Sequence, residues 1–146
     1  MQLRPDLTPL RAGQLTVTWR ILLALGWSAA FFAYAAVWQA SVQLGIGTWW
    51  IGPRAQPTPT LVRLVPFIAC LGVVLLVVYG RRWLPIVGVV VGLGLTMWSL
   101  PDFSRSTSLA LTELIISSSL VMISAVSWTG LVRAARHGAE PTDDGR

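Results

Sequence analysis

Long apolar stretches, separated by short segments that carry arginine, make up most of the hydrophobic and polar pattern of this chain. Four of them run over residues 21–44, 61–80, 84–100 and 108–132. A hydrocarbon core about 30 Å thick is crossed by about 20 residues of α-helix. The pattern therefore predicts an all-α protein, a four-transmembrane-helix antiparallel bundle that has the lipid bilayer as its surroundings.

The connections between the stretches differ in length. Arg81-Arg82-Trp83 is so short that the second and third helices must be antiparallel neighbours, and residues 101–107 bring the third and fourth together in the same way. The longest connection, residues 45–60, is rich in glycine and proline. We expect its first half to lie on the outer membrane surface, with Trp49 and Trp50 among the lipid headgroups.

The distribution of arginine predicts the orientation. With a cytoplasmic N-terminus, eight arginines lie inside and three outside, in agreement with the positive-inside rule. Both termini are then cytoplasmic, residues 1–20 form a short cytoplasmic segment, and residues 133–146 form a polar tail that we expect to be disordered. The inner set is Arg4, Arg11, Arg20, Arg81, Arg82, Arg133, Arg136 and Arg146, and the outer set is Arg54, Arg63 and Arg105.

Composition agrees with a membrane protein and argues against a nucleic-acid partner. The mean hydropathy is +0.66, and 12% of residues are charged, where a soluble domain has about 25%. The net charge of +5 comes from arginines at helix ends, which is typical of topology signals rather than of a phosphate-binding surface.

Small residues are spaced for close helix packing in two of the spans. Gly88 and Gly92 are four residues apart in the third, and Ala29 and Ala33 lie on a smooth face of the first. Small residues let helix backbones approach each other in lipid, where hydrophobic burial contributes little. This packing either closes the bundle itself or joins two copies of the chain.

Glu113 is the one acidic residue inside a predicted span, and such a residue is a candidate proton carrier, cation ligand or substrate contact. The alternative is a structural ion pair with Arg63, which enters the second span from the same side at a similar depth. Gln39 and Gln43, one turn apart in the first span, either join Glu113 and Arg63 in a small polar pocket or are solvated at the interface.

The chain has few residues that carry out catalysis or bind metals. Its single cysteine, Cys70, lies inside the second span and is expected to be buried and structural. Its single histidine, His137, lies in the predicted tail. No cluster of histidine, cysteine and carboxylate side chains and no phosphate-binding loop is present. We therefore expect no metal, no cofactor and no enzymatic activity.

Two pairs of segments resemble small, uncharacterised four-helix integral membrane proteins of actinobacteria. They are Leu44–Pro53 with Val62–Phe67, and Pro101–Arg105 with Leu109–Leu114. The resemblance implies a bacterial multi-pass protein of the plasma membrane and brings no established activity. Small multidrug transporters have a similar length, but they are expected to carry their membrane glutamate in the first helix rather than the fourth.

Two functions are compatible with this pattern. The scarcity of reactive groups and the small-residue faces favour an accessory or scaffold subunit of a membrane complex, bound to a membrane-protein partner. The alternative is a small oligomeric transporter or channel that uses Glu113.

Overall fold

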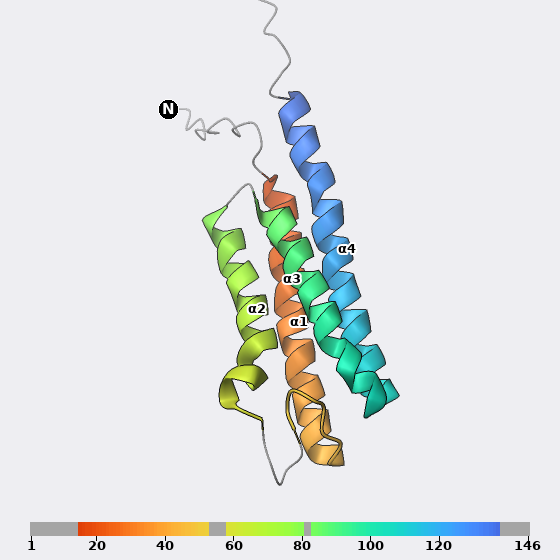
Figure 1. Cartoon of the computed structure of the whole chain (residues 1–146). Coiled ribbons are helices and arrows are strands. Elements are labelled where there is room, and N and C mark those ends of the chain that lie inside the picture. Colours follow the sequence, from red (N-terminus) through yellow and green to blue (C-terminus); the bar gives the residue numbers. More distant parts are fainter. Residues whose placement is uncertain (1–14, 53–57, 81–82, 138–146) are drawn as a thin grey trace, which may run out of the picture.

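The computed structural model describes residues 15–52, 58–80 and 83–137, with side chains described as far as residue 130. Four helices are long and apolar enough to cross a membrane: α1 (Val17–Leu44), α2 (Thr60–Tyr79), α3 (Leu84–Ser99), which a 3-10 turn, η1 (Leu100–Ser104), extends, and α4 (Thr107–His137). Successive helices run in opposite directions (Figure 1). The predicted all-α, four-helix fold is confirmed.

The start of α1 and the end of α4 lie together at one end of the bundle, which we call the terminal end (Figure 1). The connection after α1 and the turn η1 lie at the opposite end, which we call the loop end. Both termini of the helical bundle are therefore on one side of the membrane. That this side is the cytoplasm stays a prediction from the arginines. Residues 1–14 of the expected cytoplasmic segment lie outside the described residues.

The helix boundaries differ from the predicted spans at three places. α1 begins at Val17, so the last residues of the expected N-terminal segment are helical. The segment after Leu100 was expected to be a loop, but η1 continues the course of α3 for about another turn and buries Asp102. α4 continues to His137, so the first residues of the expected disordered tail are helical, and residues 138–146 lie outside the described part.

α3 and α4 form the closest helix pair, and glycine makes this contact possible. A Cβ added at Gly92 would lie 2.8 Å from Val121 Cγ2 and 3.2 Å from the Val121 backbone nitrogen. A Cβ added at Gly88 would lie 2.5 Å from Ser124 Oγ. Both glycines are buried within this chain, so their spacing serves packing inside the bundle.

Ala29 and Ala33 occupy a different environment from the two glycines. Ala29 is exposed and Ala33 half-buried, and both line a groove between α1 and α4 instead of a closed contact. In that helix pair the close approaches come from Gly26, next to Ile123, and from Gly130, next to the Trp19 indole.

At the terminal end, Arg20 ties α1 to the last turn of α2. Its guanidinium donates hydrogen bonds of 3.0 Å to the Val77 carbonyl and 2.8 Å to the Val78 carbonyl. Gly80 ends α2 in the left-handed conformation (φ 65°), and the carbonyls of the last turn of a helix have no partner within it. A cation at this position also interacts favourably with the helix dipole.

Large apolar side chains cover the outside of the bundle. Phe32 is 70% exposed, Val90 63% and Met122 67%. A surface of this kind is unfavourable in water but suits a protein surrounded by lipid chains. The chain is therefore a multi-pass membrane protein by its fold and surface.

Candidate functional site

The first half of the connection after α1 folds into the loop end of the bundle. Gly45 ends α1 in the left-handed conformation (φ 72°), and the Gly52 N–H closes a turn on the Thr48 carbonyl at 2.8 Å. Within this turn Thr48 is 2% exposed, Trp50 0% and Ile51 7%. The expectation that both indoles lie among lipid headgroups is therefore wrong for Trp50, which lies inside the bundle.

Trp50 meets Glu113 in the interior. Glu113 lies about two turns into α4 and is 1% exposed. The Trp50 indole N–H donates a hydrogen bond of 2.9 Å to Glu113 Oε1. An indole N–H that is buried in an apolar environment needs an acceptor, and the carboxyl group supplies it. Glu113 therefore fastens the loop to α4.

Asp102 is the site residue that the sequence reasoning missed. It lies in η1, is 0% exposed, and accepts a hydrogen bond of 2.6 Å from the Trp49 backbone N–H at Oδ1. Its carboxyl group also interacts with that of Glu113. We call Asp102, Glu113, Trp49 and Trp50 the carboxyl cluster. In the sequence Asp102 follows Pro101 in a short polar connection, and no local pattern there indicates that its side chain is buried.

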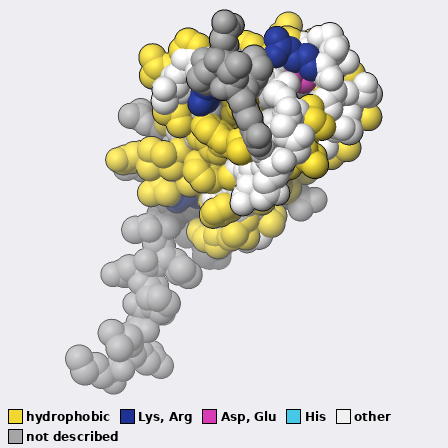
Figure 2. Space-filling view, turned by 90° about the horizontal axis from the view of Figure 1, so that it is seen from below, with side chains coloured by type: hydrophobic (Ala, Val, Ile, Leu, Met, Phe, Trp, Pro, Cys, Tyr) yellow, Lys and Arg dark blue, Asp and Glu magenta, His cyan; other side chains and the backbone are white. Residues whose placement is uncertain are grey.

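Aromatic rings surround the carboxyl cluster. The Trp49 indole N–H donates a hydrogen bond of 2.6 Å to the Trp98 carbonyl, and the two rings lie 4.4 Å apart. Trp50 packs edge-on against Trp38 at 5.9 Å, and Phe67 lies next to both. Seen from the loop end, hydrophobic side chains share the surface with uncharged polar groups and backbone, and basic groups and a small acidic patch are visible (Figure 2). By their exposed fractions, 0% for Asp102 and 1% for Glu113, the two carboxyl groups are buried.

Arg63 does not form the expected ion pair with Glu113. In the part of the chain that the structure describes, Glu113 interacts with Trp50 and Asp102 instead, and the buried Nε atom of Arg63 has no hydrogen-bond partner. The folded loop supplies a neutral donor instead, because the Trp50 indole N–H binds Glu113 Oε1. Arg105, next to η1, is the basic side chain that acts on Asp102.

Gln39 and Gln43 are both exposed on α1 and lie outside the carboxyl cluster. Among the described residues, the hydrogen-bonded partners of Glu113 are Trp50 and Asp102 rather than these glutamines. The polar residue of this helix end that turns inward is Ser41, which is 3% exposed and donates a hydrogen bond of 2.5 Å to the Ile46 carbonyl. It stabilises the reversal of the chain after α1.

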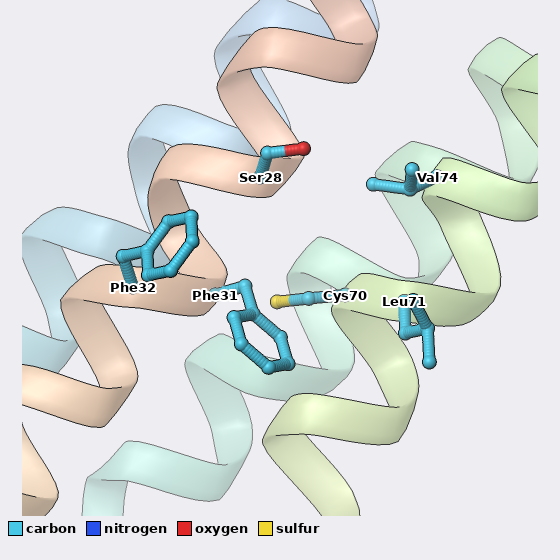
Figure 3. Close-up of a pocket in the computed structure, with 6 residues that line it drawn as sticks. All are labelled: Ser28, Phe31, Phe32, Cys70, Leu71 and Val74. Carbon is cyan, nitrogen blue, oxygen red and sulfur yellow. The ribbon is translucent and has the colours of Figure 1, made fainter.

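Cys70 is free and fully buried, as expected for a structural cysteine. Its sulfur points from α2 toward α1, between Ser28 and Phe31, at the base of a small apolar groove of about 170 Å³ (Figure 3). Among the described residues no group of three metal-binding side chains is present.

Comparison with known proteins leaves the site to be interpreted from its own geometry. A scan against protein-family models, a search of curated proteins and a search of solved structures each return no match.

Proposed function

We propose that this chain is a non-enzymatic accessory or scaffold subunit of a plasma-membrane complex, and that it binds a transmembrane helix of a partner protein. The observation that carries the proposal is the groove between α1 and α4, which has a volume of about 340 Å³ and opens on the lipid-facing surface. It is lined by Gly26, Ala29, Ala30, Ala33, Ile115, Ile116, Ser119, Leu120 and Ile123.

The composition of this groove suits a helix better than it suits a polar substrate. Ala29 and Ala33 are one turn apart on α1, and Ser119 faces the groove from α4. Small side chains allow a second helix to approach closely, and such contact gives van der Waals packing that lipid chains reproduce poorly. The resemblance to small actinobacterial membrane proteins adds one element to this proposal: the partner is sought in a bacterial plasma membrane.

Photo-crosslinking in native membranes tests the proposal. A photoreactive amino acid at Ala29 is expected to give one recurrent adduct with a different membrane protein. Ala33→Leu fills the groove and should reduce this adduct at least tenfold. Val90→Leu, at a position 63% exposed on α3, is the matched control and should leave it unchanged. An adduct between two copies of this chain, or an adduct unaffected by Ala33→Leu, would contradict the proposal.

A second candidate, a small oligomeric transporter or channel that uses Glu113, is favoured by the carboxyl cluster. Buried ionisable groups at membrane depth mark ion and proton pathways in many membrane proteins. From Glu113 toward the terminal end, α4 carries the buried hydroxyl groups of Ser117, Ser124 and Ser127. Leu120 lies between Ser117 and Ser124. Ser117 and Ser124 lie about 10 Å apart along the helix axis, which is too far for direct proton transfer within one chain.

Proton flux into liposomes distinguishes this second candidate. The full chain is reconstituted with an entrapped pH-sensitive dye, and a transmembrane pH difference is applied. A transporter or channel for protons would dissipate the difference faster than empty liposomes do, and Glu113→Gln would remove the excess rate. Equal rates for wild type, Glu113→Gln and empty liposomes are the result expected from an accessory subunit.

A further inference from the structure

The two carboxyl groups of the carboxyl cluster are both removed from water. Asp102 is 0% and Glu113 1% exposed, and they reach the same place from η1 and α4. Each carries a partner from the loop, the Trp49 backbone N–H on Asp102 Oδ1 at 2.6 Å and the Trp50 indole N–H on Glu113 Oε1 at 2.9 Å. One N–H donor per carboxyl group is a small number for a buried carboxylate, because each ionised group accepts up to four hydrogen bonds.

The second oxygen of Asp102 is the unusual atom of the site. Asp102 Oδ2 is buried and has no hydrogen-bond partner in the described part of the chain. The Asp102 side chain also interacts with the carboxyl group of Glu113. Two ionised carboxylates in such contact would repel each other in a medium that screens charge weakly. One proton between them removes one charge and also supplies the missing hydrogen bond.

The other charged and titratable groups around the pair do not replace this proton. Arg105 attracts Asp102 from the turn after η1, but it is itself exposed to the surroundings. Tyr34 of α1 interacts electrostatically with Glu113 and with Cys70 of α2, and both Tyr34 and Cys70 are neutral in their usual protonation states. The loop contributes the neutral Trp49 and Trp50, and α3 contributes the backbone at Trp98, which accepts from Trp49.

We propose that Asp102 and Glu113 form a proton-binding site, in which one proton is shared between Asp102 Oδ2 and the Glu113 carboxyl group. The pair then carries a single negative charge in total, and every carboxyl oxygen that faces the partner carboxyl is hydrogen-bonded. This site goes beyond the proposed accessory function and does not depend on it. When the proton leaves to solvent at high pH, two adjacent buried charges remain, which weakens the attachment of the loop at Trp49 and Trp50.

Infrared spectroscopy of the purified full chain in lipid nanodiscs tests the site. The sequence contains six acidic residues, and the other four, Asp6, Glu140, Asp143 and Asp144, lie outside the spans near the two ends. At neutral pH these four are expected to be ionised. The wild type should therefore show the carbonyl band of a protonated carboxylic acid, which shifts in D₂O and disappears in one step as the pH is raised.

Amide variants assign the band. Asp102→Asn and Glu113→Gln should each abolish it at neutral pH, because the amide N–H takes the place of the shared proton and the remaining carboxyl group ionises. Glu140→Gln, a change of the same chemistry outside the spans, should leave the band unchanged. Absence of the band in the folded wild type, or its survival in both amide variants, would overturn the proposal.

Isotope labelling keeps the test independent of variant folding. In the wild type, ¹³C in the aspartate or glutamate side-chain carboxyl groups should shift the band, and no amino-acid change is needed. A band at neutral pH that responds to neither label would show that the protonated group is elsewhere, and the proposed site would fail.

Discussion

The α3–α4 contact and the loop end of the bundle bring helices together with different residues. Between α3 and α4, Gly88 and Gly92 remove side chains so that Ser124 and Val121 approach the backbone. At the loop end, Asp102 and Glu113 accept hydrogen bonds from a loop that connects two other helices. In lipid, both close packing and buried hydrogen bonds hold helices together.

The difference between the two regions lies in what each tolerates. The glycine contact depends on shape, so any added atom must displace the facing helix. The carboxyl cluster depends on donors and acceptors, so a substitution that preserves both volume and hydrogen bonding should be accepted. Single substitutions can test this difference, because each region has a matched control position on the same or a neighbouring helix.

The largest effect is expected from Gly92→Leu. Its side chain would collide with Val121 Cγ2 and with the Val121 backbone, which cannot move without shifting α4. Overpacking costs about 1–3 kcal/mol and occasionally more, and we expect a loss of about 3 kcal/mol in the free energy of unfolding. SDS titration of the detergent-solubilised protein measures it.

Gly94→Leu is the control for this substitution. Gly94 is on the same helix, and a Cβ added there has no described neighbour within 4 Å. The free energy of unfolding should change by less than about 0.5 kcal/mol. Equal losses for both variants would show that the α3–α4 contact is not specific to Gly92.

A smaller loss is expected from Trp50→Phe, which keeps an aromatic ring but removes the N–H that Glu113 accepts. A buried hydrogen bond lost from one side costs about 1–3 kcal/mol. In combination with Glu113→Met the two losses should be non-additive, since both remove the same interaction. Trp128→Phe, at a position 50% exposed on α4, is the control and should be near neutral. Strictly additive losses would contradict the contact.

Much of the fold was predictable because membrane thickness imposes helix length. The apolar stretches predict four helices; the ends of α1, α2 and α3 agree with them within one residue, while α1 begins at Val17 instead of residue 21. Every long apolar stretch in lipid must satisfy its backbone internally, so hydropathy alone identifies a helix.

The site was predictable only in part, because it depends on a loop. Glu113 stood out as an acid inside a span, but its partners come from Trp49 and Trp50, which interfacial statistics place among headgroups. The sequence places Asp102 in a polar connection. Neither Trp50 nor Asp102 carries a sequence signal for burial, because their burial requires that the loop and η1 meet in space. Contacts between residues far apart in the chain leave no periodic pattern in the local sequence, so hydropathy does not predict them.

A still smaller effect is expected for the energetic coupling between Glu113 and Arg63. Since the two side chains form no ion pair in the described structure, the losses of Glu113→Met and Arg63→Gln should add within about 0.5 kcal/mol. The same cycle with Asp102→Asn in place of Arg63→Gln should show a clear departure from additivity. Coupling to Arg63 that equals the coupling to Asp102 would return the ion pair to consideration.

The smallest effect is expected at Gln39 and Gln43, which sequence reasoning had grouped with Glu113. Both are exposed on α1, and exposed substitutions away from special features change the free energy of unfolding by less than about 0.5 kcal/mol. Gln39→Ala and Gln43→Ala should therefore be near neutral. Ser41→Ala removes a smaller side chain, but this side chain is buried and donates a hydrogen bond to the Ile46 carbonyl. We expect it to cost about 1 kcal/mol. Thermal unfolding of the three variants in one detergent measures the difference. A larger loss at either glutamine than at Ser41 would contradict the exposed position of the two glutamine side chains on α1.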